Sequence, residues 1–291
     1  MTTIRKFIYV LGFLCLITRV EGQESIQQNY DPSGATTFRL ENLNGSVKIV
    51  GTESSTLSME VRLTPSEYEV DVPEYEAPKP SFTFSQKGET LFLNIILPEE
   101  ETNHDFWREP VRRNPWGSDW WDNSGVEPAY AYQMDFTLKV PKSLNLMVST
   151  MHNGDIHIRE MNGKLDVKNQ HGDIRLEDVQ GRVRTKTFHG DISVSYLRNP
   201  TEDSFFKTFN GEIFTRFQKG VAARMTFLSR KGEFFTNLPE LEYKQQEVTK
   251  KKGMEGSGVS YKIQRTASVI SREGTVALHF ETYNGDVYAK E

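Results

Sequence analysis

Three aspartates spaced 18 residues apart are the side chains best placed to do chemistry. Asp155, Asp173 and Asp191 each follow a glycine and precede an isoleucine. If equivalent turns stack, their carboxylates form a column, and a polysaccharide lyase or hydrolase requires clustered carboxylates. The repeat already explains these residues, and the sequence contains no serine nucleophile elbow, no zinc-binding histidine pair on a helix and no phosphate-binding loop. We therefore predict no catalytic residues, and we assign the aspartates to turns where they satisfy backbone N–H groups.

The Gly-Asp units also invite comparison with calcium-binding solenoids, which are built from nine-residue halves. Those proteins need two glycines and an aspartate in every half. Here each half has one glycine, and Lys164 or Arg182 stands at the aspartate position of the alternate halves. Because a basic residue repels a hard cation, calcium binding is the weaker interpretation.

Two histidines, His171 and His189, lie one repeat apart, and each stands two residues before an aspartate. Stacking could bring them close enough for a fortuitous metal site. His152 is displaced by one residue relative to this pair, and Asn210 has the corresponding position in the next repeat. The displacement predicts that no three-high histidine ladder forms, so a polar turn ladder is the better explanation. We predict no metal ion and no cofactor.

All four tryptophans fall within 15 residues, in a segment over 98–128 that is rich in Pro, Gly, Asn and charges. This composition indicates a loop, and long loops in compact domains are usually functional or disordered. Aromatic rings beside arginine are typical of surfaces that bind protein or sugar, so we predict a binding patch. Two alternatives stay open: the rings cap the open end of the fold, or the segment is disordered. The predicted patch comprises Trp107, Arg108, Trp116, Trp120 and Trp121.

The elements that must carry these residues come from an internal repeat in the middle of the chain. Glycines recur every nine residues from Gly154 to Gly190, and every second one opens a Gly-Asp-Ile unit, so the full period is 18. Apolar and polar residues alternate between the glycines, which indicates short strands with one buried face. No proline occurs between Pro141 and Pro200, so every backbone N–H there can join a ladder. Apolar positions match one period apart, which a row of β-hairpins in an antiparallel sandwich, the alternative, does not require.

The predicted fold is therefore all-β: a β-solenoid similar to a right-handed parallel β-helix, with 18–21 residues per coil and an N-terminal antiparallel β part. Glycine supplies the turn conformations between the strands. We expect an N-terminal linker over 23–35, the N-terminal β part over 36–151, solenoid repeats over 152–239, a flexible polar loop over 240–262 and strands that close the solenoid over 263–291. The predicted turn glycines are Gly45, Gly154, Gly163, Gly172, Gly181, Gly190, Gly211, Gly232 and Gly285.

Residues 1–22 have the pattern of a secretory signal peptide. Arg5 and Lys6 precede an apolar run over 7–17, and Gly22 provides a small residue at the cleavage site. Cleavage there would remove Cys15, the only cysteine, and leave a mature chain without thiols. An N-terminal anchor helix is the alternative. No later segment is apolar for long enough to span a bilayer, so we expect export to the periplasm, the cell surface or the extracellular space.

The charge balance and the motifs together suggest the class of partner. A net charge of -5 and a pI near 5.8 disfavour a nucleic-acid partner. The signal peptide, Asn-Gly-Ser-Val over 44–47, the alternating strand that ends at Val140-Pro141 and the Gly-Asp-Ile units resemble the bacterial “putative adhesin” family of uncharacterised secreted or envelope β-solenoid domains. The resemblance covers 36–291, is strongest over 140–235, and implies an envelope location and no catalytic residues.

We therefore expect a secreted, non-catalytic, adhesin-like module that interacts with an envelope or surface protein or polysaccharide. A carbohydrate-active β-solenoid enzyme and a structural spacer of the envelope are the alternatives. An acidic groove with side chains from outside the repeat would favour the enzyme, and exposure of the tryptophans separates a binding module from a spacer.

Overall fold

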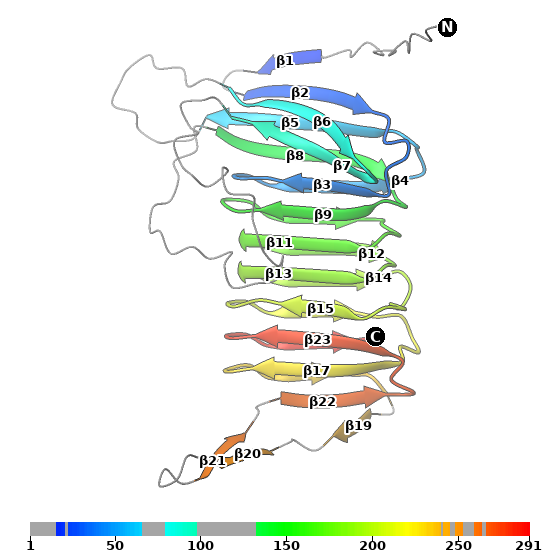
Figure 1. The fold of residues 1–291 in the computed structure, drawn as a ribbon, viewed down its shortest axis with the longest axis vertical. Helices are drawn as coiled ribbons and strands as arrows, with labels where there is room; N and C mark the ends of the chain where they lie inside the picture. Colours follow the sequence, from blue (N-terminus) through cyan, green and yellow to red (C-terminus); the bar gives the residue numbers. More distant parts are fainter. Residues whose placement is uncertain are drawn as a thin grey trace, which may run out of the picture.

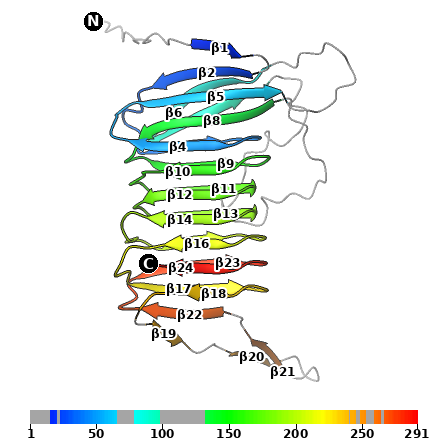
Figure 2. The ribbon, with the colours of Figure 1, turned by 180° about the vertical axis from the view of Figure 1, so that it is seen from behind.

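In the part of the chain that the computed structural model describes, every element of regular secondary structure is a β-strand. They form two 11-stranded sheets, here called sheet A and sheet B, and one separate hairpin. The strands stack like rungs along one long axis (Figures 1 and 2). The prediction of an all-β fold is confirmed. The described residues are 16–20, 23–65, 79–97, 132–239, 241–244, 248–252, 259–263 and 266–291.

Sheet A forms one side of the stack (Figure 2). Its strands, in spatial order, are β1 (Leu16–Val20), β2 (Gln23–Tyr30), β5 (Leu57–Pro65), β8 (Tyr132–Pro141), β4 (Val47–Thr52), β10 (Ile156–Arg159), β12 (Ile174–Val179), β14 (Ile192–Tyr196), β16 (Ile213–Arg216), β24 (Val287–Lys290) and β18 (Phe234–Thr236).

Sheet B forms the other side (Figure 1). Its strands, in spatial order, are β19 (Leu241–Lys244), β22 (Thr266–Ser271), β17 (Ala223–Ser229), β23 (Val276–Thr282), β15 (Ser204–Lys207), β13 (Val183–His189), β11 (Leu165–His171), β9 (Asn145–Thr150), β3 (Thr37–Glu41), β7 (Thr90–Ile96) and β6 (Ser81–Lys87).

The middle of the chain alternates between the two sheets, and the strands within each sheet pair in parallel. Ile174 of β12 pairs with Ile156 on one side and Ile192 on the other, and all three side chains are fully buried. This predicted apolar column therefore forms, because alternate side chains of each strand point inward. A second predicted column, Met161, Val179 and Leu197, ends at Val179, because the register shifts there and Tyr196 pairs with Val179 while Leu197 is exposed. A sandwich of antiparallel hairpins is excluded for these strands. Each passage through one strand of sheet A and one of sheet B is called a coil below; the handedness of the coils stays a prediction.

The segment 263–291 is expected to close the stack, but two of its three strands, β23 and β24, insert into it, and only β22 lies near the end of sheet B. β24 lies between β16 and β18, and β23 lies between β15 and β17. Val287 pairs with Ile213 on one side and with Phe234 on the other. The last Gly-Asp unit, at Gly285, makes the same turn as Gly211, whose carbonyl oxygen it contacts, so the chain end fits between two earlier coils.

Parallel stacking begins earlier than the predicted boundary at residue 152. β4 pairs in parallel with β10, with Val47 opposite Ile156, and β3 pairs in parallel with β9. Antiparallel pairs also occur in this region, between β5 and β8 and between β6 and β7. The N-terminal part is therefore mixed rather than antiparallel, and the expected linker over 23–35 contains strand β2, which pairs with β5.

The segment 240–262, expected to be a flexible polar loop, contains three strands. β19 pairs antiparallel with β22 at the end of sheet B, and β20 (Val248–Lys252) pairs with β21 (Val259–Ile263) as a separate hairpin. The lysine-rich composition outweighed the alternation of apolar and polar residues in β19 (LEYK) and β21 (VSYKI). Among the described residues, no helix is long and apolar enough to cross a membrane.

Candidate functional site

The aspartates of the Gly-Asp units bind the backbone of the next coil. The Oδ1 atom of Asp155 accepts a hydrogen bond of 2.8 Å from the N–H of Asp173, and Asp173 does the same for Asp191. Asp191 then accepts the N–H of Glu212 at 2.7 Å. The carboxylates thus form a column, with one oxygen of each engaged in holding adjacent coils together. Burial and the charges of Asp191 and Asp286 raise the pKa of Glu212 above its usual value.

The histidines form the three-high ladder that the sequence argued against. The rings of His152 and His171 stack with centroids 5.9 Å apart, and those of His171 and His189 stack at 5.3 Å. The prediction failed because Asn153 adopts a left-handed conformation, with φ of 49°, and absorbs the extra residue within the turn. This conformation leaves His152 in register with His171.

Asparagines extend the ladder on both sides of the histidines. Asn44 is bridged to His152, and Asn210 lies between His189 and Asn284. The Nδ2 atom of Asn284 donates to Oδ1 of Asn210 at 2.6 Å. The stacked rings lie within 20° of parallel, so their nitrogens do not converge on one point. Among the described residues, no group of three His, Cys, Asp or Glu could hold a metal ion.

The turn glycines are required because the backbones of neighbouring coils touch. Gly190 has φ of +145°, and a Cβ atom there would lie 2.2 Å from the carbonyl oxygen of Gly172. Gly154 has an ordinary φ, but its Cβ would lie 2.2 Å from the backbone of Gly45. The remaining predicted turn glycines meet a backbone atom of an adjacent rung at similarly short distances. This turn column has no room for a side chain or a ligand.

The predicted tryptophan patch lies outside the described residues. It comprises Trp107, Arg108, Trp116, Trp120 and Trp121, all between the end of β7 and the start of β8. Whether these residues bind a partner or cap the fold therefore stays a prediction.

A different aromatic cluster lies on the outer face of sheet A. Phe214, Tyr288 and Phe235 come from the adjacent strands β16, β24 and β18, and we call them the aromatic strip. The ring of Tyr288 stacks on Phe214 at 4.8 Å and on Phe235 at 5.0 Å. Phe214 and Phe235 are 38% and 39% exposed. The sequence did not suggest this cluster, because its members are far apart in the chain and meet only through the insertion of β24.

Charged side chains flank the aromatic strip on both sides. Glu212, Asp286 and Glu233 stand two residues before the three rings, each immediately before the strand that carries the ring. Arg216 and Lys290 stand two residues after Phe214 and Tyr288, and the Lys290 ammonium lies 5.2 Å from the Tyr288 ring centroid. Because alternate residues of a strand share a face, Arg216 and Lys290 belong to the same outer face of sheet A as the rings. Desolvation raises the pKa of Tyr288, and Glu212, Asp286 and Glu233 lie close enough to raise it further.

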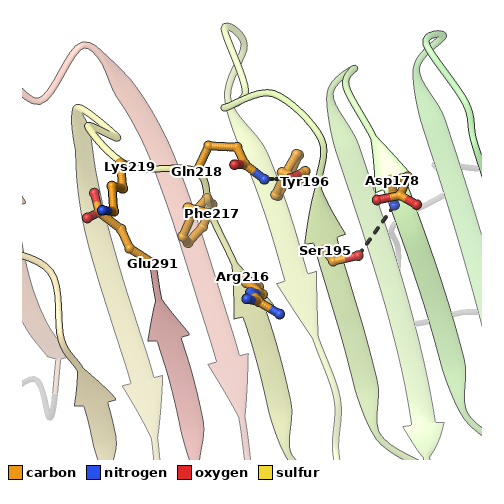
Figure 3. A pocket seen from close by; sticks show the side chains of 8 residues that line it. All are labelled: Asp178, Ser195, Tyr196, Arg216, Phe217, Gln218, Lys219 and Glu291. Carbon is orange, nitrogen blue, oxygen red and sulfur yellow. Dashed lines mark hydrogen bonds between the residues drawn. The ribbon is translucent and has the colours of Figure 1, made fainter.

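A shallow pocket of about 400 Å³ adjoins the strip at Arg216 (Figure 3). Its floor is held by two hydrogen bonds: the Nε2 atom of Gln218 donates to the Tyr196 carbonyl at 2.7 Å, and the N–H of Asp178 donates to Ser195 Oγ at 3.3 Å. Its lining is polar and of mixed charge. The lining residues are Asp178, Ser195, Tyr196, Arg216, Phe217, Gln218, Lys219 and Glu291.

Comparison with known proteins shows the family of the chain and names no ligand. Residues 134–279, half of the chain, match the family described as Toastrack DUF4097. No curated protein matches the sequence. A crystal structure of a “putative cell adhesion protein” from Clostridium sporogenes ATCC 15579 is similar over 92% of this chain and 99% of its own, with 14% identity and a TM-score of 0.44. A score at this level supports no argument about function.

Proposed function

We propose that this chain, which belongs to the Toastrack DUF4097 family, is an exported, non-catalytic and adhesin-like interaction module. It binds an envelope or surface partner through the outer face of sheet A. Export is supported by the signal-peptide pattern over 1–22.

The observation that carries this proposal is the exposure of the aromatic strip. Phe214 and Phe235 each leave more than a third of their surface in water, on strands whose inward side chains are fully or largely buried. The fold does not need phenylalanine at these outward positions, where Ser193 stands opposite Phe214 in the preceding coil. Aromatic rings in contact with one another and with water, rimmed by charges, are typical of binding surfaces.

The carboxylates of the Gly-Asp units accept backbone hydrogen bonds, and this favours a binding module over a carbohydrate-active enzyme. A glycosidase needs one carboxyl group as an acid and another as a base or nucleophile, free to reach the substrate. Asp155, Asp173 and Asp191 each commit an oxygen to a backbone N–H. Their recurrence once per coil follows from this structural role.

A capture experiment tests the proposal. The full chain is expressed in an exporting host, purified, immobilised and incubated with an envelope extract. We compare wild type with the Phe214→Ser/Phe235→Ser double variant. The matched control is Leu228→Ser, since Leu228 is 42% exposed but lies on strand β17 of sheet B. We expect wild type and the control to retain the same material, and the strip variant to retain at least about fivefold less.

Each other outcome excludes the proposal in favour of one alternative. Equal retention by all three proteins would place binding elsewhere on the molecule. No retention by wild type would indicate a structural spacer. Release of new reducing ends from a retained polysaccharide would indicate the carbohydrate-active enzyme. The strip variant and the control should have equal urea-unfolding midpoints. A difference in retention then reflects binding rather than a loss of folded protein.

A further inference from the structure

We infer that the pocket beside Phe214 binds a carboxylated sugar unit of an acidic polysaccharide. The inference rests on the proposed function and specifies the class of ligand that sheet A recognises. It follows from the charged side chains of the pocket, from the hydrogen bonds that its polar groups already make, and from the ring of Phe214 near its border.

Two cations line the pocket, and neither is paired with a carboxylate among the described residues. Arg216 pairs in register with Lys290 of β24, so two positive side chains stand side by side on the same face. Like charges at directly opposite positions of neighbouring strands destabilise a sheet. Neither Arg216 nor Lys219, which lines the same pocket, forms an ion pair with a carboxylate in the part of the chain that the structure describes. A bound anion would relieve this repulsion.

The two carboxylates that line the pocket form no ion pair with these cations in the part of the chain that the structure describes. The Oε1 atom of Glu291 accepts the backbone N–H of Gly220 at 2.8 Å, so this oxygen is already engaged with the chain. Asp178 stands on the far side of the pocket from Glu291, as Figure 3 shows. The guanidinium of arginine presents parallel N–H donors that match the two oxygens of a carboxylate. Arg216 is therefore the group best suited to bind an acidic substituent, and Lys219 lines the same pocket.

The remaining lining suits the rest of a sugar unit. Asp178 and Gln218 carry acceptors and donors for hydroxyl groups, and both side chains are exposed. Phe214 lies two residues before Arg216 on the same face of β16, which places an apolar ring at the border of a polar pocket. A flat, apolar surface beside hydrogen-bonding groups matches a pyranose, which has apolar faces and a polar rim. The shallow shape suits one unit of a chain that continues along the face.

Titration calorimetry with two carboxylated probes, oligogalacturonate and polysialic acid, tests the inference on the full chain. The uncharged methyl ester of oligogalacturonate serves as the ligand control. We expect at least one acidic probe to bind, with an affinity that falls as salt is added, and the methyl ester to bind at least about tenfold more weakly.

Protein variants locate the site. Arg216→Gln and Lys219→Gln should each weaken binding of the acidic probe, the first by about tenfold or more, because a charge-assisted hydrogen bond is lost. Arg224→Gln on sheet B and Lys48→Gln, also on sheet A but four rungs away by strand order, remove the same charges elsewhere and should bind as wild type does. All four side chains are exposed, so the unfolding midpoints should not change.

Three results would overturn the inference: neither acidic probe binds, the methyl ester binds as tightly as the acid, or Arg216→Gln and Lys219→Gln bind as wild type does. If any of these occurs while capture from the envelope extract still depends on Phe214 and Phe235, the proposed function stands and the ligand is not an acidic sugar. If that capture also fails, both proposals fall.

Discussion

The Oδ1 atom of Asp173 lies 2.8 Å from the backbone nitrogen of Asp191, one coil further along the stack. The same contact joins Asp155 to Asp173 and Asp191 to Glu212. A side chain of one coil thus satisfies the backbone of the next, at a turn where no strand pairing is available. Each aspartate is therefore part of the link between coils rather than a feature of its own turn.

Replacing Asp173 with alanine should lower the free energy of unfolding by about 1–2 kcal/mol, because the N–H of Asp191 loses a charged acceptor. Asp173→Asn should lose less, since its carbonyl oxygen can still accept. Urea denaturation measures both changes. Glu273→Ala, in an exposed turn between β22 and β23, is the control and should change stability by less than about 0.5 kcal/mol. A loss no larger than that of the control would show that the column does not couple the coils.

Alanine substitutions at two glycines with positive φ distinguish the cost of backbone strain from the cost of a close contact between coils. Gly190→Ala would place a Cβ atom 2.2 Å from the Gly172 carbonyl oxygen, whereas Gly88→Ala, with φ of +59°, meets nothing within 4 Å. The second change should cost about 1–2 kcal/mol from the left-handed conformation alone. The first should cost clearly more, because adjacent coils must also move apart. Thermal unfolding compares the two variants, and equal losses would contradict the close stacking of the turns.

Glu212 should make stability depend on pH in an unusual direction. Burial and the neighbouring carboxylates raise its pKa, so the folded state binds the proton more readily than the unfolded chain does. Its ionised form therefore destabilises the fold at neutral pH, and the penalty disappears as the pH falls and Glu212 becomes protonated. We expect Glu212→Gln to raise the free energy of unfolding at pH 7 by less than about 1 kcal/mol, because solvent screens the repulsion.

At pH 4 the gain from Glu212→Gln should be smaller. Urea denaturation at both pH values gives the difference in the free energy of unfolding between the variant and wild type. The contributions of the other titrating groups are the same in both proteins and cancel in this difference. Glu273→Gln controls for the loss of a negative charge in general. A gain that grows as the pH falls would contradict the raised pKa.

The sequence predicts the repeat well where the period is regular. Ile156, Ile174 and Ile192 stack as expected, because an 18-residue spacing, alternation and glycine turns all specify one register. It fails at His152, where the spacing differs by one residue and the outcome depends on whether Asn153 adopts a left-handed conformation. Spacing alone carries no information about that backbone choice.

The candidate site could not be predicted for a related reason. Phe214 and Phe235 are 21 residues apart, as Gly211 and Gly232 are, but Tyr288 does not follow this spacing, and only the insertion of β24 between β16 and β18 brings it between them. The signal that could have shown this is the Gly-Asp-Val unit at 285–287, which repeats the motif at 211–213 with Asp in place of Glu. Its distance along the chain suggested a closing element rather than an internal coil.

Export predicts a defined processed form. Intact-mass measurement of the protein recovered from its native host should show loss of about 22 residues, because the apolar run and the small residue at position 22 direct cleavage there. The product should contain no thiol, since Cys15 is removed, and should not react with a maleimide reagent. Retention of Met1 would contradict export through a cleaved signal and favour the anchor helix.

The aromatic strip should contribute to binding far more than to folding. Phe235 is 39% exposed at the edge strand of sheet A, so Phe235→Ser should cost only about 1 kcal/mol in the free energy of unfolding. Phe206 is the matched residue inside the stack: it is fully buried, and its ring stacks on Phe280 at 5.0 Å. Phe206→Ala should cost about 3–5 kcal/mol, because it removes apolar burial and leaves a cavity.

Urea denaturation of these two variants distinguishes a surface kept for a partner from one kept for stability. If Phe235→Ser costs as much as Phe206→Ala, the strip is part of the core, and its exposure gives no reason to expect a partner. If Phe235→Ser costs little and capture from envelope extract is unchanged, the ring contributes neither to stability nor to binding. Only a small cost combined with lost capture agrees with a binding surface on sheet A, because an exposed ring that the fold does not need must then be engaged by the partner.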